Sequence, residues 1–226
     1  MDISLVIPLY NEGDSLSPLT DWIFQSLEDE KYKFEIIFVD AGSNDKSWEV
    51  INRLIKVNDL LKSQTSFLLL IYDSWRPLEV QEFMFKRAFL LECEKSDIDT
   101  SFENIKSYPS ILKKVEKFWA YPSYDTRCPP PHSTGGALDV CLSDKNGNLL
   151  EMGSMVDQMD ETSNPYFYAN IKNEEAIIWN SRRNLLREIM TKFGFAQHPN
   201  EWWHFSYGDQ LWAWKNKKAN ALYGKI

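Results

Sequence analysis

Two short segments that lie far apart in this chain carry the side chains of a possible metal site. The first segment contains His132 and Asp139, and the second contains Glu201 and His204. Two histidines and one aspartate are sufficient protein ligands for a catalytic Zn²⁺ that keeps one coordination position open. A fold that brings His132, Asp139 and His204 together leaves Glu201 free to act as a base toward a water molecule on the metal.

Each of these residues also has an ordinary structural explanation. A histidine in a glycine-rich loop, such as His132, is often a solvated or capping residue, and Glu201 alone is compatible with a surface charge. Asp139 is harder to explain in this way, because a carboxylate within an apolar strand needs a partner or a metal. The residues therefore indicate a site only in combination.

The composition is typical of an ordinary globular protein and excludes several classes of partner. The 226 residues fit one large domain, or one domain with an appendage, and they are 43% hydrophobic and 26% charged. The net charge is −8, whereas nucleic acids and anionic membranes bind clustered Lys and Arg. No apolar run approaches the ~20 residues of a membrane span. We therefore expect neither a nucleic-acid nor a membrane partner.

The cysteines and the N-terminus favour a cytoplasmic protein. Cys93, Cys128 and Cys141 are odd in number and show no CxxC spacing, so we expect reduced thiols rather than a disulfide framework. The N-terminus has no basic region before its apolar residues, as a secretory signal would.

The first fifty residues alternate between strand and helix patterns. Apolar runs over residues 3–9 and 33–40 predict two buried strands, and apolar spacing over 15–30 predicts a helix between them. This order is typical of a βαβ unit, whose two strands are parallel.

The same stretch resembles the start of an inverting family-2 glycosyltransferase, in which two strand ends hold the nucleotide of a sugar donor. The resemblance rests on Val6 to Glu12 and Glu35 to Ser43, and it ends near residue 50. Ala41 stands where that family usually has a second aspartate, and no later Asp-x-Asp metal motif follows. We therefore expect residues 1–54 to be a truncated, non-catalytic glycosyltransferase-like segment.

The remainder mixes helices and strands in an irregular order, which predicts an α+β fold. The expected strands cover 66–73 and 137–142, and a tight turn is expected at 144–148. Helices are expected over 47–62, 78–93, 102–118 and 173–193, with loops over 120–131 and 152–172.

Several separated motifs in this part together resemble the zinc D-alanyl-D-alanine dipeptidases of the vancomycin-resistance type. They are His132-x-x-Gly-x-Ala-x-Asp139, Glu201-x-Trp-His204, Tyr72 to Pro77 and Met152 to Asp157. The resemblance covers about residues 55–224. It implies a domain over 55–226 with the small zinc D,D-peptidase fold and its central antiparallel sheet.

The resemblance also implies a role for each site residue. One Zn²⁺ per chain would be held by His132, Asp139 and His204. Glu201 would be the general base toward the metal-bound water, and Arg76 would stabilise the oxyanion. Asp157 matches a carboxylate that binds the substrate ammonium. The structural alternative for Arg76 is an ion pair with Asp73 or another carboxylate.

The function implied is hydrolysis of D-Ala-D-Ala, or a similar small D,D-dipeptide of cell-wall metabolism, to free D-amino acids. One alternative is a D,D-carboxypeptidase acting on muropeptides, which a cytoplasmic location disfavours. Another is a fusion protein that binds zinc but has an incomplete substrate pocket. Pro131 replaces a serine usual in the family, and residues 1–50 replace the segment that supplies part of the pocket wall.

Overall fold

The computed structural model describes residues 3–9, 34–40 and 47–224, and side chains from residue 51 onward. The chain divides into two compact units, Met1–Lys56 and Val57–Ile226. The division falls inside helix α2 (Ser47–Gln64).

The N-terminal unit contains two parallel strands. In β1 (Ile3–Leu9) and β2 (Phe34–Asp40), the register runs from Ile3 opposite Phe34 to Leu9 opposite Asp40. Both predicted strands are therefore present, with the parallel pairing that a βαβ unit requires. The helix expected over 15–30 lies outside the described residues.

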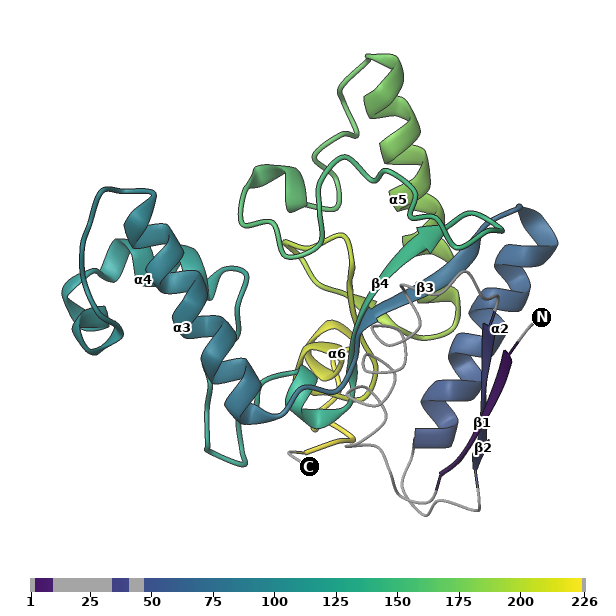
Figure 1. The fold of residues 1–226 in the computed structure, drawn as a ribbon, viewed down its shortest axis with the longest axis horizontal. Coiled ribbons are helices and arrows are strands. Elements are labelled where there is room, and N and C mark those ends of the chain that lie inside the picture. Colours follow the sequence, from purple (N-terminus) through teal and green to yellow (C-terminus); the bar gives the residue numbers. More distant parts are fainter. Residues whose placement is uncertain (1–2, 10–33, 41–46, 225–226) are drawn as a thin grey trace. The chain divides into compact units, whose positions relative to one another are not determined.

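The second unit is built on a four-stranded antiparallel sheet, which confirms the α+β prediction. Its strand order is β3-β4-β6-β5, and β3 and β4 form its longest pair (Figure 1). All seven residues of β4 are buried, as expected for a central strand. The strands are β3 (Leu68–Asp73), β4 (Ala137–Ser143), β5 (Ala196–Gln197) and β6 (His204–Ser206).

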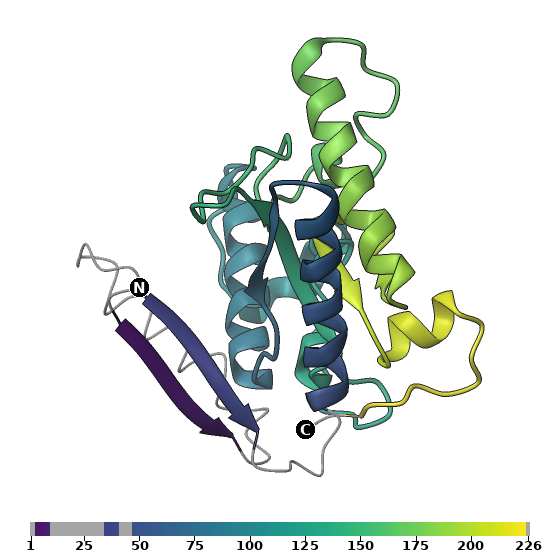
Figure 2. The same cartoon turned by 90° about the vertical axis from the view of Figure 1, so that its right-hand side faces the viewer.

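Helix α5 (Glu174–Lys192) packs against this sheet and begins where the sequence predicted. Asn173 is its N-cap, because the Asn173 side chain accepts a hydrogen bond from the Ala176 backbone at 2.7 Å. Helix α6 (Gln210–Lys215) lies near the C-terminal end of α5 (Figure 2). Trp212 Nε1 donates to the Gly194 carbonyl at 2.9 Å and fixes this contact.

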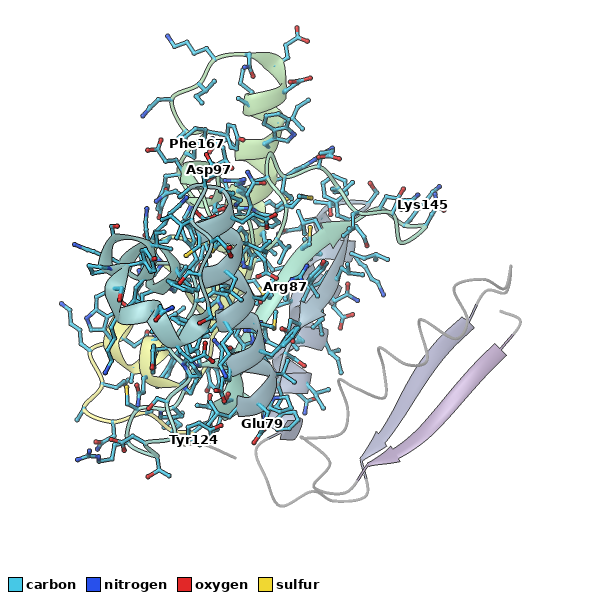
Figure 3. All side chains as sticks on the ribbon, turned by 60° about the vertical axis from the view of Figure 1, so that its left-hand side comes forward. Glu79, Arg87, Asp97, Tyr124, Lys145 and Phe167 are labelled. Carbon is cyan, nitrogen blue, oxygen red and sulfur yellow. The ribbon has the colours of Figure 1, made fainter. Side chains whose placement is uncertain are left out.

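Helix α3 (Leu78–Glu94), the 3₁₀ helix η1 (Phe102–Ser107) and helix α4 (Pro109–Glu116) form a lobe to one side of the sheet (Figure 1). The segment after α4 returns to α3, since Tyr124 Oη donates to Glu82 at 3.0 Å. Figure 3 shows Tyr124 at the same end of the lobe as Glu79, in the first turn of α3. The lobe has its own apolar core: Phe85, Ala88, Phe89, Cys93, Ile105, Ile111, Val115 and Trp119.

The prediction of one continuous helix over 102–118 was wrong. The chain leaves the helical region at Tyr108, where φ is −124° and ψ is 62°. Tyr108 precedes Pro109, and a residue before proline is disfavoured in the helical conformation. Pro109 then begins α4, a position where its missing N–H has no consequence.

Among the described residues, no helix combines the length and the apolar character needed to cross a membrane. The three cysteines form no disulfide in the same part of the chain.

Arg183, on α5, is fully buried and organises the loop that carries Asp157. Its guanidinium also lies over the rings of Tyr168 and Trp202, at 4.8 and 5.2 Å. Burial lowers the pKa of Arg183 to about 10, so the side chain stays charged at neutral pH. It donates hydrogen bonds to Met152 O, Thr162 O, Asn164 O and Ser154 Oγ.

We expect Arg183→Met to lower the free energy of unfolding by about 3 kcal/mol or more, because each buried acceptor without a donor costs roughly 1–3 kcal/mol. Urea unfolding followed by circular dichroism measures the change. The control is Arg182→Met, whose guanidinium donates to Glu151 O at an exposed site, and we expect a loss within about 1 kcal/mol. Equal stability of the two variants would contradict this role.

Candidate active site

The sheet brings the three predicted metal ligands together. Asp139 on β4 pairs directly with His204 on β6. His132 lies in a 3₁₀ helix, η2 (His132–Thr134), just before β4, and Gly135 turns the chain between them with φ 68°. One ligand atom from each residue lies within 4.8 Å of the other two, and all three side chains are buried.

The hydrogen bonds around the imidazoles leave His132 Nε2 and His204 Nδ1 facing Asp139. His132 Nδ1 is 2.7 Å from the Ser74 carbonyl, which can only accept, so Nδ1 carries a proton and Nε2 is the nitrogen left for a metal. That Nε2 is 3.3 Å from Asp139 Oδ2. His204 Nδ1 is 3.1 Å from Asp139 Oδ1, while its Nε2 is 3.4 Å from Ser206 Oγ, which can accept its proton. This is how metal-bound histidines are usually held.

The residues fit a bound Zn²⁺. Asp139 Oδ1 is buried and has no hydrogen-bond partner. Although burial opposes its charge, His132 and His204 hold the pKa of the Asp139 carboxyl well below its usual range. Two imidazole nitrogens and a charged carboxylate therefore face one another, and a cation between them satisfies all three. Nitrogen and carboxylate ligands of this kind suit zinc.

Glu201 lies beside this group but is not part of it. It is 4% exposed, and its Oε2 is 3.6 Å from His204 Nδ1 and from His198 Nδ1. Burial, and then the charges of Asp139 and Asp157, raise the pKa of Glu201 well above its usual value. A carboxylate with a raised pKa is a stronger base than an ordinary one.

Backbone contacts hold the segment around Glu201 rigidly. The Trp202 N–H donates to Ser163 O at 3.0 Å, and the Trp203 carbonyl accepts from Val140 N at 2.9 Å. Both tryptophans are almost fully buried. The Glu201 backbone is therefore fixed against the sheet that carries Asp139 and His204.

Arg76 forms the ion pair that the structural alternative predicted and also borders the site. Its Nε and Nη2 donate to Asp73 Oδ2 at 3.0 and 2.5 Å, and Nη2 is 3.7 Å from Asp139 Oδ2. Nη1 donates to Gln81 Oε1 at 2.7 Å. These bonds use three of the five guanidinium N–H groups.

One cavity joins all of the predicted site residues. Its empty volume is about 420 Å³, including space open to solvent. Phe118, Trp119 and Pro131 add apolar surface to its lining. The predicted residues that line it are Arg76, His132, Asp139, Asp157, Glu201 and His204.

Asp157 has an unusual backbone and an unusual carboxyl group. Its φ is 64°, a left-handed conformation that few residues other than glycine adopt. Burial, and then the charge of Asp139, raises the pKa of Asp157 to about 6.

Sequence reasoning missed two polar residues of the cavity, Gln81 and His198. Burial, and then the neighbouring His204, lowers the pKa of His198 to about 3, so it is neutral. Its place three residues before Glu201, as one of only three histidines in the chain, was a usable signal. Gln81 had no such signal.

Two family models match the chain. The model described as D-Ala-D-Ala dipeptidase matches residues 47–221, and the model described as family 2 glycosyl transferase matches residues 4–66. An undecaprenyl-phosphate 4-deoxy-4-formamido-L-arabinose transferase of Edwardsiella ictaluri is 43% identical over 49 residues, which are 22% of this chain and 15% of that protein. Both resemblances drawn from the sequence are therefore confirmed.

A D-alanyl-D-alanine dipeptidase of Synechocystis sp. is similar along nearly the whole chain. It is 32% identical over 234 aligned positions, covering 98% of this chain and 93% of that protein. Because the alignment covers 98% of this chain, it includes the N-terminal segment. The residues that match the glycosyltransferase model therefore also align with a dipeptidase.

Among solved structures, a mutant of the vancomycin-resistance D,D-pentapeptidase VanY in complex with Zn(II) is 16% identical. The alignment covers 77% of this chain and 79% of that chain, with a TM-score of 0.46. Membership rests on the family model, which spans most of the chain, and on the nearly full-length relative. This chain belongs to the D-Ala-D-Ala dipeptidase family and is a zinc metallopeptidase.

Proposed function

We propose that this protein hydrolyses D-Ala-D-Ala, or a similar small D,D-dipeptide, to free D-amino acids. The observation that carries the proposal is the convergence of His132, Asp139 and His204 on one point, with Glu201 beside them in the same cavity. We assign one Zn²⁺ per chain to these three ligands. When bound, Zn²⁺ supplies Lewis-acid polarisation of a carbonyl and lowers the pKa of water.

Glu201 is assigned the proton transfers. Its carboxylate takes a proton from the attacking water and passes it to the departing amine of the second D-amino acid. The raised pKa supports both steps, because a weakly acidic carboxyl accepts a proton readily and still releases it. Glu201 is buried and lines the cavity, so its carboxyl group is largely shielded from bulk water.

Arg76 is assigned the developing negative charge on the carbonyl oxygen. Its ion pair with Asp73 fixes the guanidinium at the cavity edge and does not use all of its donors. A preorganised cation aimed at the place where charge develops is an effective form of transition-state stabilisation. The ion-pair and catalytic interpretations of Arg76 are therefore compatible.

One observation and one proposed property favour an active dipeptidase over the alternatives. The nearly full-length alignment with a dipeptidase includes the N-terminal segment, which argues against a foreign fusion that removes part of the pocket. We propose that residues 1–54 are part of the peptidase and catalyse no sugar transfer. A cytoplasmic location, proposed from the sequence, favours a free dipeptide over muropeptides.

The direct test is incubation of the zinc-loaded protein with D-Ala-D-Ala and detection of free D-Ala. L-Ala-L-Ala and a pentapeptide ending in D-Ala-D-Ala are the comparison substrates. We expect release from D-Ala-D-Ala to be the fastest. Faster release from the pentapeptide would favour the carboxypeptidase, and no release from any substrate would reject the proposal.

Asp157→Asn is expected to raise KM for D-Ala-D-Ala by about 10-fold, because a hydrogen bond to a charged group contributes roughly 1.5–3 kcal/mol. With a pKa of about 6, the Asp157 carboxyl is ionised above pH 6 and neutral below it. Only the ionised form attracts the substrate ammonium. KM of the unaltered protein should therefore rise as pH falls below 6, whereas KM of the variant should not.

Steady-state kinetics between pH 5 and 8 measure both effects. The exposed Asp59→Asn variant is the control and should keep the unaltered pH profile. Identical profiles for Asp157→Asn and Asp59→Asn would remove Asp157 from substrate binding.

A further inference from the structure

Gln81 connects two parts of the cavity wall that lie far apart in the sequence. It sits in the first turn of α3 and is 1% exposed. Arg76 Nη1 donates to Gln81 Oε1 at 2.7 Å, and Gln81 Nε2 donates to the Ala120 carbonyl at 2.7 Å. One buried amide thus binds the active-site cation at one end and the segment after α4 at the other.

The amide fits this place in one orientation. A guanidinium has only donors, so it requires the carbonyl oxygen of Gln81, and the Ala120 carbonyl can only accept, so it requires the amide nitrogen. A side chain without both groups leaves one buried partner unsatisfied. Glutamate can accept from Arg76 but cannot donate while ionised, and methionine can do neither.

The segment that Gln81 holds is the apolar wall of the cavity. The Trp119 ring lies 5.3 Å from the central guanidinium carbon of Arg76. The wall and the cation are therefore in contact, and the Gln81 amide is the polar link between them. The wall residues are Phe118, Trp119 and Ala120.

We propose that Gln81 is a positioning residue, which holds the Arg76 guanidinium and the wall at 118–120 in one fixed relation. The inference rests on the proposed function, since it takes Arg76 as the group that stabilises the oxyanion. Asp73 holds one edge of the guanidinium, and Gln81 accepts from Nη1. Without Gln81, the guanidinium can tilt about the ion pair with Asp73. A misplacement of about 1 Å can lower a rate about 100-fold.

Gln81→Met keeps the length of the side chain and removes both hydrogen bonds. We expect it to lower kcat for D-Ala-D-Ala by about 10- to 100-fold and to raise KM, with the zinc content unchanged. Gln81→Glu keeps the acceptor for Arg76, so it should recover most of kcat while KM stays raised. If Gln81→Met does not fold, Gln81→Glu still tests the inference through its raised KM.

Gln210→Met is the matched control. Gln210 Nε2 also donates to a distant backbone carbonyl, Arg127 O, at 2.6 Å, but Gln210 does not line the cavity. We expect unaltered kinetics. Unaltered kinetics of Gln81→Met would overturn the inference.

A double-mutant cycle separates positioning from a general structural effect. If Gln81 acts through Arg76, Gln81→Met should change kcat by less than about twofold in an Arg76→Met background. An equal loss in both backgrounds would overturn the inference.

If the unaltered protein releases no D-Ala, the proposed function fails, and amide hydrogen exchange of residues 118–121 then decides the role of Gln81. Faster exchange in Gln81→Met than in Gln210→Met supports positioning, and equal exchange overturns it.

Discussion

Replacing Glu201 with glutamine should lower kcat for D-Ala-D-Ala by about 1,000-fold, because general acid–base catalysis contributes roughly 10²- to 10⁴-fold. The amide has nearly the same shape as the carboxyl group but cannot accept the proton of the attacking water. Glu201 is 3.6 Å from His204 Nδ1 and outside the group of metal ligands, so the zinc content should not change. Metal analysis and D-Ala release from the same preparation measure the two quantities.

Glu188→Gln is the control for this prediction, since Glu188 is exposed on α5. It carries the same change of charge and should leave kcat unaltered. A Glu201→Gln variant that loses its zinc would make Glu201 a ligand rather than a base. A variant that keeps both zinc and activity would place the base elsewhere.

The raised pKa of Glu201 has a structural origin that the sequence did not reveal. Sequence reasoning identified Glu201 by its spacing from His204 and by the family resemblance. The acidity of the group depends on burial and on Asp139 and Asp157, which come from two other segments. A pKa of this kind follows from the assembled cavity, because no local pattern specifies which carboxylates will face one another.

The long elements could be predicted and the short ones could not. The strands of 66–73 and 137–142 were recognised because each is a mostly apolar run, and they became β3 and β4. Strands β5 (Ala196–Gln197) and β6 (His204–Ser206) are too short to show a period. The pairing that sets His204 beside Asp139 is therefore visible only in the sheet.

Gln81 illustrates a second limit of prediction from sequence. Its two partners are Arg76, five positions before it, and Ala120, 39 positions after it. The second partner is a backbone carbonyl, which has no signature in the sequence. The break in the helix at Tyr108, by contrast, could have been predicted from the sequence. Pro109 is present there, and its effect on the preceding residue follows from sterics.

The N-terminal segment shows how a resemblance can be correct and still leave the function open. Residues 4–66 match a glycosyltransferase model, and β1 and β2 pair in parallel. The alignment with the Synechocystis dipeptidase nevertheless runs through the same residues. A strand pair of this kind is compatible with many activities, since fold does not imply function. The peptidase site, whose chemistry is specific, therefore carries the functional argument.

The second large effect is expected for Asp139→Asn, which should reduce the zinc content from about one ion per chain to background and abolish D-Ala release. The amide lacks the negative charge that attracts Zn²⁺. Ligand identity largely determines metal affinity at such sites. Asp99→Asn, at an exposed position, is the control and should retain zinc. Zinc at the unaltered level in Asp139→Asn would move the metal site elsewhere.

Thermal unfolding gives this prediction a readout that does not depend on activity. A ligand that binds only the folded state stabilises it by about 2.7 kcal/mol at 100 times its Kd. His132 precedes β4 and His204 lies on β6, so a shared ion ties two separate segments to the central strand. Added Zn²⁺ should therefore raise the Tm of the unaltered protein and of Asp99→Asn. It should leave the Tm of Asp139→Asn unchanged, because that variant loses the carboxylate on which both imidazoles converge.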